Sequence, residues 1–201
     1  MGNFVEIFSV PSEPDPKRPD EFRRPEWAGP PESELGVTVP LGAILGRAGN
    51  GVIALPHVLA YSTGISFELL VFARGLRAGQ VNRLFHEQHL IDQEEGLPDG
   101  FLRVGIELEG GARVSNLDGG LAGRRWDEEP SGPILMQHGG GSGMSNPGEV
   151  TMRPAFWLWP LPPSGALKVS CEWPIVGIPL TTTELDADAL REAAGRARPL
   201  F

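Results

Sequence analysis

The amino-acid sequence predicts a mainly β protein, an antiparallel β-sandwich or partly open barrel with one short internal helix and a C-terminal helix. Its 27 glycines and 20 prolines interrupt the 201 residues more densely than a helical bundle tolerates. Several segments also alternate apolar and polar residues with the period of two that half-buried strands require. The length suits one core with appendages, so we expect a single immunoglobulin-like sandwich domain over residues 37–201.

The first 36 residues are expected to lie outside this domain. Asn3–Val10 has the β-branched and aromatic content of one short strand that could add to a sheet edge. Pro11–Glu34 carries many prolines and mixed charge, a composition too polar to be ordered by burial, so it predicts an extended arm. Trp27 either anchors this arm to the domain surface or is exposed to solvent, and both alternatives stay open.

The next segments read as consecutive strands. Val37–Arg47 and Gly51–Tyr61 are apolar runs separated by a Gly-Asn turn signal, which predicts a hairpin. A third strand is expected over Ile65–Arg74. Apolar residues then recur at helical spacing between Ala78 and Gly96, which predicts one amphipathic helix.

The second half predicts further strands around one long loop. Phe101–Glu109 alternates cleanly and turns at two glycines into Ala112–Asn116. Residues 118–149 are Gly-rich and charged, so we expect a long mobile loop in which only Ile134–Gln137 forms a short strand.

Three strands and a helix complete the prediction. The strands are expected over Thr151–Trp159, Ala166–Trp173 and Ile178–Glu184, and alternation in the second directs Cys171 into the core. Asp186 is expected to cap a C-terminal helix.

Charge and cysteine content exclude some classes of partner and favour a cytoplasmic protein. The formal net charge of −9 repels nucleic acid and anionic membrane surfaces. The single cysteine, Cys171, cannot form an internal disulfide, and the longest apolar stretch is too short to span a bilayer. The expected partner is therefore a protein, or a second copy of this chain.

His86 and His89 are the candidate metal ligands. On a helix, this spacing of three directs both imidazoles to nearly one face, where they could hold a divalent cation. His57, His138, Asp92 and Glu94 are possible further ligands. The alternative is a polar helix face with partly exposed histidines, and no other cofactor is expected.

Nucleophilic catalysis has little support in the sequence. Cys171 falls on an inward strand position, where a thiol acts as a small hydrophobe, and no G-x-S-x-G elbow occurs. The Gly-rich run after His138 lacks the lysine and hydroxyl residue of a phosphate-binding loop. Acidic runs such as Asp127–Glu129 are typical of solvated charge, so no catalytic residue is assigned.

One strand is apolar on both faces. Trp157 and Trp159 share one face of Thr151–Trp159, whereas Phe156 and Leu158 share the other. Such a strand is either central in a sandwich or partly exposed to a partner. Trp157, Trp159 and Trp27 are therefore the candidate interface residues.

Several motifs together resemble a group of uncharacterised actinobacterial proteins of about this length. They are R-P-E-W-A-G-P-P-E-S-E-L-G (24–36), A-Y-S-T-G (60–64), N-R-L-F-H-E-Q-H (82–89), W-L-W-P-L-P-P-S-G (157–165) and E-W-P (172–174). The resemblance covers most of the chain. It implies a bacterial cytoplasmic protein and no particular activity.

Two hypotheses about function follow. The first is a non-catalytic sandwich that binds a protein partner or itself, for example an immunity or inhibitor protein whose acidic surface covers a basic partner. The alternative is a metal-dependent enzyme or small-ligand-binding protein that uses His86 and His89, with residues 118–149 as a lid.

Overall fold

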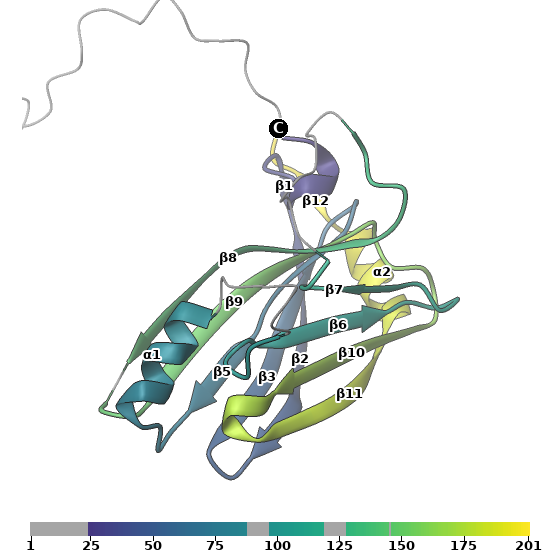
Figure 1. Ribbon diagram of the computed structural model, residues 1–201. Helices are drawn as coiled ribbons and strands as arrows, with labels where there is room; N and C mark the ends of the chain where they lie inside the picture. Colours follow the sequence, from purple (N-terminus) through teal and green to yellow (C-terminus); the bar gives the residue numbers. More distant parts are fainter. Residues whose placement is uncertain (1–23, 88–96, 119–127, 145) are drawn as a thin grey trace, which may run out of the picture.

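A computed structural model describes residues 24–87, 97–118, 128–144 and 146–201 (Figure 1). Antiparallel strands dominate, and two sheets face each other across one core, which confirms the predicted β-sandwich class. The predicted strand Asn3–Val10 and the end of the predicted helix beyond Glu87 lie outside the described residues. No helix within the described ranges is long and apolar enough to cross a membrane.

The larger sheet has six strands. They are β2 (Val37–Ala48), β3 (Gly51–Ala60), β4 (Ile65–Glu68), β5 (Leu70–Ala73), β8 (Ile134–Met144) and β9 (Val150–Trp159). The predicted hairpin is confirmed as β2 and β3, with Ala48 opposite Gly51. The predicted third strand is divided at Leu69, whose N–H donates to the Pro154 carbonyl at 3.0 Å. Both halves, β4 and β5, pair with β3 and with β9.

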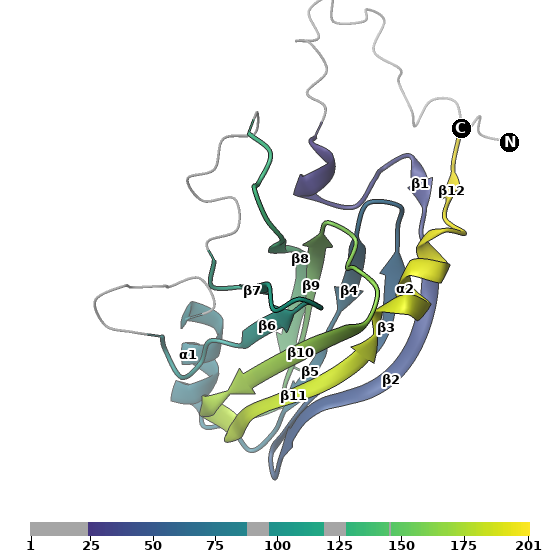
Figure 2. The same ribbon diagram turned by 90° about the vertical axis from the view of Figure 1, so that its right-hand side faces the viewer.

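The smaller sheet has four strands in the order β11-β10-β6-β7. They are β6 (Arg103–Glu107), β7 (Arg113–Ser115), β10 (Ala166–Trp173) and β11 (Ile178–Asp186), and a 3₁₀ turn, η3 (Pro174–Val176), joins the last two. β2 runs beside β11 where the two sheets meet (Figure 2). There the Thr181 Oγ1 hydroxyl of β11 donates to the Leu45 carbonyl of β2 at 2.6 Å.

Alternation decides which side chains fill the space between the sheets. In β10, the side chains of Leu167, Val169, Cys171 and Trp173 are all buried, as their period of two predicts. In and around β6, the alternating apolar residues are also buried: Leu102, Val104, Ile106 and Leu108. The buried Trp173 indole N–H donates to the Gly100 carbonyl at 3.1 Å, so its polar atom is satisfied.

Two helices and a small ribbon complete the described fold. α1 (Ala78–Glu87) follows β5, and α2 (Ala187–Ala194) follows β11 and packs against β2 and β3. The predicted cap is confirmed, because the Asp186 carboxylate accepts from the Asp188 N–H at 2.8 Å. Near the chain ends, a 3₁₀ turn η2 (Glu26–Ala28) precedes β1 (Glu34–Leu35), which pairs with β12 (Arg198–Pro199).

The Gly-rich part of the predicted loop is a strand instead. β8 runs from Ile134 to Met144, well past the predicted end at Gln137. Gly139, Gly140 and Gly141 pair with Ala155, Pro154 and Arg153 of β9, so the neighbouring strand supplies the order that the glycine composition does not. Gly140 has φ 129°, and a Cβ there would clash with the Arg153 carbonyl oxygen, so this position requires glycine.

Candidate functional site

The metal hypothesis falls largely outside the described part of the structure. His86 lies in the last turn of α1, but its side chain is not described, and His89, Asp92 and Glu94 lie beyond the described residues. Among the residues that are described, no group of three His, Cys, Asp or Glu side chains could hold a metal ion. The His86 and His89 site therefore stays a prediction.

The two buried candidate interface tryptophans contact each other. Trp27 is 4% exposed and Trp157 is 0% exposed, and the Trp157 indole N–H donates to the Trp27 carbonyl at 3.1 Å. Tyr61 meets Trp157 edge to face, with ring centroids 5.9 Å apart. Trp27 is thus an anchor of the N-terminal segment, and the apolar outer face of β9 has an intramolecular cause. Trp27 and Trp157 are thus buried within the chain, and Trp159 is partly buried beside them. That these three residues lie at an interface with a partner stays a prediction.

His138 has a partner that the sequence did not suggest. It lies at a bulge in β8, and its Nε2 is 3.1 Å from the Ser66 hydroxyl on β4. Partial burial lowers the pKa of His138 below its usual value, and the nearby charge of Arg24 lowers it further. The neutral imidazole could accept a proton, but Ser66 is 7% exposed, so its hydroxyl is closed to a substrate. His57 lies on β3, with β4 and β9 between it and β8.

Cys171 has the inward orientation that alternation predicts. Its side chain is 1% exposed, and its Sγ is 3.4 Å from the Thr181 hydroxyl. Burial raises the pKa of the thiol, so it stays protonated near neutral pH. A buried, protonated thiol is a poor nucleophile, which agrees with its predicted structural role.

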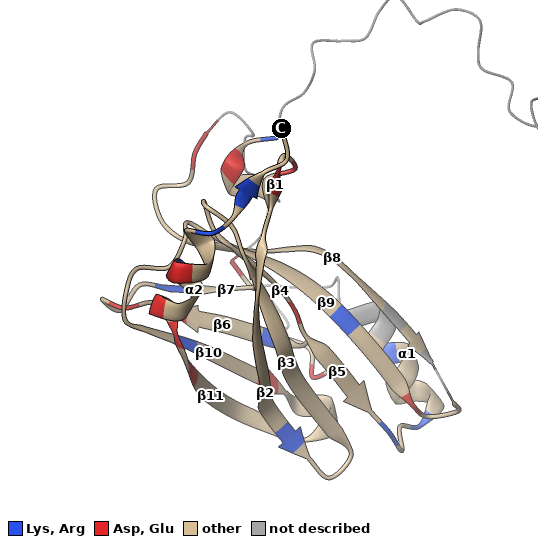
Figure 3. Ribbon diagram, turned by 180° about the vertical axis from the view of Figure 1, so that it is seen from behind, with Lys and Arg blue, Asp and Glu red and all other residues tan. Residues whose placement is uncertain are grey.

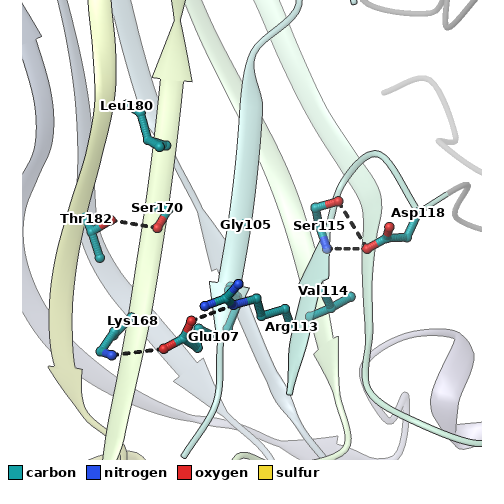
Figure 4. Close-up of a pocket in the computed structure, with 11 residues that line it drawn as sticks. Gly105, Glu107, Arg113, Val114, Ser115, Asp118, Lys168, Ser170, Leu180 and Thr182 are labelled. Carbon is teal, nitrogen blue, oxygen red and sulfur yellow. Dashed lines mark hydrogen bonds and ion pairs between the residues drawn. The ribbon is translucent and has the colours of Figure 1, made fainter. Parts of the chain in front are cut away.

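A hollow lies on the outer face of the four-stranded sheet. It encloses about 640 Å³ and is lined from all four strands and from the turn after β7 (Figure 4). Apart from the buried Ile106 and Val114, its lining residues lie on the outer face of the sheet, and the hollow is open to solvent. Strand register arranges these side chains in rows that cross the sheet.

The floor of the hollow is a row of small residues, which we call the hydroxyl row. Thr182 pairs with Ser170, Ser170 with Gly105, and Gly105 with Ser115. The Ser170 and Thr182 hydroxyls are 2.8 Å apart, and the Asp118 carboxylate accepts from the Ser115 hydroxyl at 3.1 Å. Every position in the row is therefore either a hydroxyl or exposed backbone.

A row of alternating charge forms one wall. Glu184, Lys168, Glu107 and Arg113 are successive cross-strand neighbours. Lys168 and Arg113 lie 2.9 and 2.6 Å from the two oxygens of Glu107. The hydrogen bond from Lys168, then the one from Arg113, lowers the pKa of Glu107, and the Glu107 carboxylate raises the pKa of Lys168. All three groups are consequently charged at neutral pH.

Beyond the hydroxyl row, on the side away from the charged wall, the sheet carries a second ion pair and an exposed leucine. Arg103 and Glu172 are cross-strand neighbours with a 2.5 Å contact between Nη1 and Oε2. Lys168 and Glu172 lie four positions apart on β10, about 13 Å at ~3.3 Å per residue. Leu180 on β11 is 69% exposed beside the hydroxyl row. The hollow thus combines polar side chains with apolar ones, of which Leu180 is the exposed one.

Gly105 is the unusual residue of this floor. Glycine in a strand interior weakens the strand, and it often marks a place where a ligand or another backbone approaches closely. A Cβ at Gly105 would meet only the Val114 carbonyl oxygen, at 3.8 Å, which is ordinary contact. Crowding within the chain therefore does not explain this glycine.

Sequence reasoning identified the strands of this site but not the site. The alternation of β10 predicts that Lys168 and Ser170 point away from Cys171, and they do. The sequence contains no signal that places β6 between β10 and β7, and this order builds the rows. Comparisons with protein-family models, curated proteins and solved structures find no match, so the site is interpreted from its own chemistry.

Proposed function

We propose that the protein is a non-catalytic binding protein that recognises a short, extended polypeptide segment of a partner protein across the hydroxyl row. The observation that carries this proposal is Gly105, an open glycine in a central strand with no cause inside the chain. A partner backbone that lies over Gly105 would supply the missing cause, because it needs room where other residues carry a side chain.

The dimensions and chemistry of the hollow suit a peptide. The row crosses four strands, about 14 Å at ~4.8 Å per strand spacing, which matches four or five extended residues at ~3.3 Å each. Hydroxyls at Thr182, Ser170 and Ser115 can donate to and accept from peptide groups. Leu180 offers one apolar contact, and the charged wall can select complementary side chains.

A small-molecule site is less consistent with this geometry. Sites for small ligands are concave and mostly apolar, and aromatic side chains line many of them. Among the residues that line this hollow none is aromatic, and the hollow is open to solvent along a sheet face. An open surface that mixes polar and apolar groups is instead typical of non-obligate protein interfaces.

The overall charge supports a basic partner. The chain has a formal net charge of −9, and complementary charge accelerates association and makes it sensitive to salt. An immunity or inhibitor protein that covers a basic target would use this property. On this proposal, raising the salt concentration slows association more than it accelerates dissociation.

A Gly105→Thr variant tests the proposal. Threonine suits strands, so the melting temperature should stay the same or rise, whereas the new side chain fills the floor of the hollow. Gly141→Thr is the matched control, because Gly141 is an exposed strand glycine of β8 with open space at its Cβ. Peptides selected from a random phage-displayed seven-residue library should bind wild type and Gly141→Thr equally, and Gly105→Thr at least tenfold more weakly.

Amide NMR spectra of the wild-type protein with a selected peptide locate the contact independently. We expect shifts at Gly105, Ser170 and Thr182. Peptides that bind Gly105→Thr as tightly as wild type, or a library that yields no binder, would overturn the proposed function.

A further inference from the structure

The outer face of the six-stranded sheet carries an apolar area that is separate from both core clusters. We call it the outer patch and define it as Ile44, Val52, Ala54, Leu70 and Phe72. Ile44, Ala54 and Leu70 are cross-strand neighbours, and so are Val52 and Phe72. Ile44 is 50% exposed, the other four are partly exposed, and none belongs to either buried cluster.

The outer patch lies on a sheet face with few charges (Figure 3). Neither β3 nor β5 contains a charged residue, and β2 contains only Arg47, at its end. Contiguous exposed apolar surface of this kind is typical of a binding site. We therefore expect another polypeptide segment to cover the outer patch.

The far end of the patch is basic and hollowed. Arg47, Val52, Phe72 and Arg74 line a depression of about 320 Å³ beside the β2–β3 turn. Neither Arg47 nor Arg74 has an ion-pair partner among the described residues. An occupant with apolar side chains and neighbouring carboxylates would satisfy both parts of this surface.

The other half of the same face is already covered by the chain around Trp27. Trp27 and Ala28 are buried with Ile134, Met136 and Trp157 in a cluster of their own on this side of the sheet. The Trp157 indole N–H fixes the Trp27 backbone through its 3.1 Å hydrogen bond. The described chain therefore begins, at Arg24, on the same face of the sheet as the outer patch, at the end opposite the β2–β3 turn (Figure 1).

We propose that the outer patch binds the N-terminal segment Asn3–Val10 of the same chain. This segment supplies Phe4, Val5, Ile7, Phe8 and Val10, and the residues after it supply carboxylates at Glu13 and Asp15 for the arginines. From Arg24 back to Val10 the chain has about 14 residues, which reach about 43 Å at ~3.1 Å per residue in a polyproline conformation. From Leu59, near the covered half, to Val52 is about 23 Å at ~3.3 Å per residue, so the reach suffices.

The tether favours this occupant over a second copy. A segment joined by a short linker reaches an effective concentration in the millimolar range, well above the concentration of a typical protein solution. The proposal is independent of the hydroxyl row, which lies on the opposite sheet.

A spin label at position 9 tests the contact in the full chain. Cys171 is 1% exposed, so a thiol-reactive nitroxide labels Ser9→Cys selectively. We expect the amide signals of Val52 and Phe72 to be more than twofold weaker with the paramagnetic label than after the label has been reduced. The amide signals of Ser170 and Thr182 should not weaken. The loss should disappear in Phe72→Asp and weaken in Arg47→Glu, whose exposed position leaves the fold intact.

A mixture of two differently labelled samples distinguishes a segment of the same chain from a segment of a second copy. Isotope-enriched protein without a spin label is mixed with spin-labelled protein of natural isotope abundance. We expect no loss of amide signal at Val52 or Phe72 in this mixed sample. Loss in the mixed sample would assign the patch to a second copy and overturn the proposal. Absence of any loss at Val52 and Phe72 in the singly labelled chain would overturn it as well.

Discussion

Replacing Trp27 by alanine tests whether the N-terminal segment is part of the folded unit. Trp27 is 4% exposed, although it lies only a few residues from the start of the described chain. A tryptophan buries about 150–250 Å². At about 25 cal/mol per Å², this burial stabilises the docked segment by roughly 4–6 kcal/mol. Mutational data for Trp→Ala give a similar cost, about 3–5 kcal/mol.

The structure sets an upper limit on the measured loss. The segment can detach from the sheet as a whole, so Trp27→Ala cannot cost more than the full free energy of docking. We therefore expect the free energy of unfolding to fall by about 3 kcal/mol. For a domain of this size, about 2–4 °C per kcal/mol converts this loss to a fall in Tm of roughly 10 °C.

Urea unfolding followed by circular dichroism measures this loss without relying on the fluorescence of the replaced residue. Trp27→Phe is the control, and it should retain most of the stability because a ring still fills the space over Trp157. In NMR spectra of Trp27→Ala, the Trp157 indole N–H resonance should shift, since its acceptor is the Trp27 carbonyl. A loss below about 1 kcal/mol with an unshifted Trp157 resonance would refute the anchoring role.

Further predictions follow from individual groups. The pKa of Glu107 is lowered from 4.5 by Lys168 and Arg113, so its ion pairs stabilise the fold above pH 4.5, and this contribution is lost as the pH falls through the lowered pKa. In Glu107→Gln, the free energy of unfolding measured with urea should therefore depend less on pH in that acid range. The pKa of His138 is lowered from 6.5 by burial, so the folded state disfavours the protonated imidazole and the stability of the protein should fall below pH 6.5. Thermal melts between pH 5 and 8 measure this fall, which should be smaller in His138→Gln. Cys171 should react with Ellman's reagent in urea and not in native buffer; rapid native labelling would contradict its burial. Gly140→Ala should lower the free energy of unfolding by about 1–3 kcal/mol because its φ is 129° and a Cβ meets the Arg153 carbonyl, whereas Gly141→Ala should change it by less than about 0.5 kcal/mol.

Local patterns were sufficient for most strands. The turn signal at Gly49-Asn50 joins two apolar runs of the required length, and the hairpin β2–β3 forms where they meet. The period of two in Ala166–Trp173 correctly assigns Cys171 to the core and Ser170 to the surface. The cap at Asp186 is a contact between residues two apart, so it is readable from a short stretch of sequence.

Long-range pairing decided the features that local patterns missed. The glycines of β8 have no side chains that would favour a strand, and they are ordered because β9 pairs with their backbone. The outer face of β9 is apolar because Trp27, 130 residues away in the chain, covers Trp157. A single sequence contains the composition of both segments but not the contact between them.

The sequence by itself determined the β class, the faces of the alternating strands and the position of the C-terminal helix, since these depend on residues within one turn or one strand. Only the tertiary structure decided the rows of the candidate site. Ser170, Gly105 and Ser115 come from three strands, and they become neighbours because β6 lies between β10 and β7. Register between strands depends on the packing of the whole core, so distant residues meet only when the chain folds.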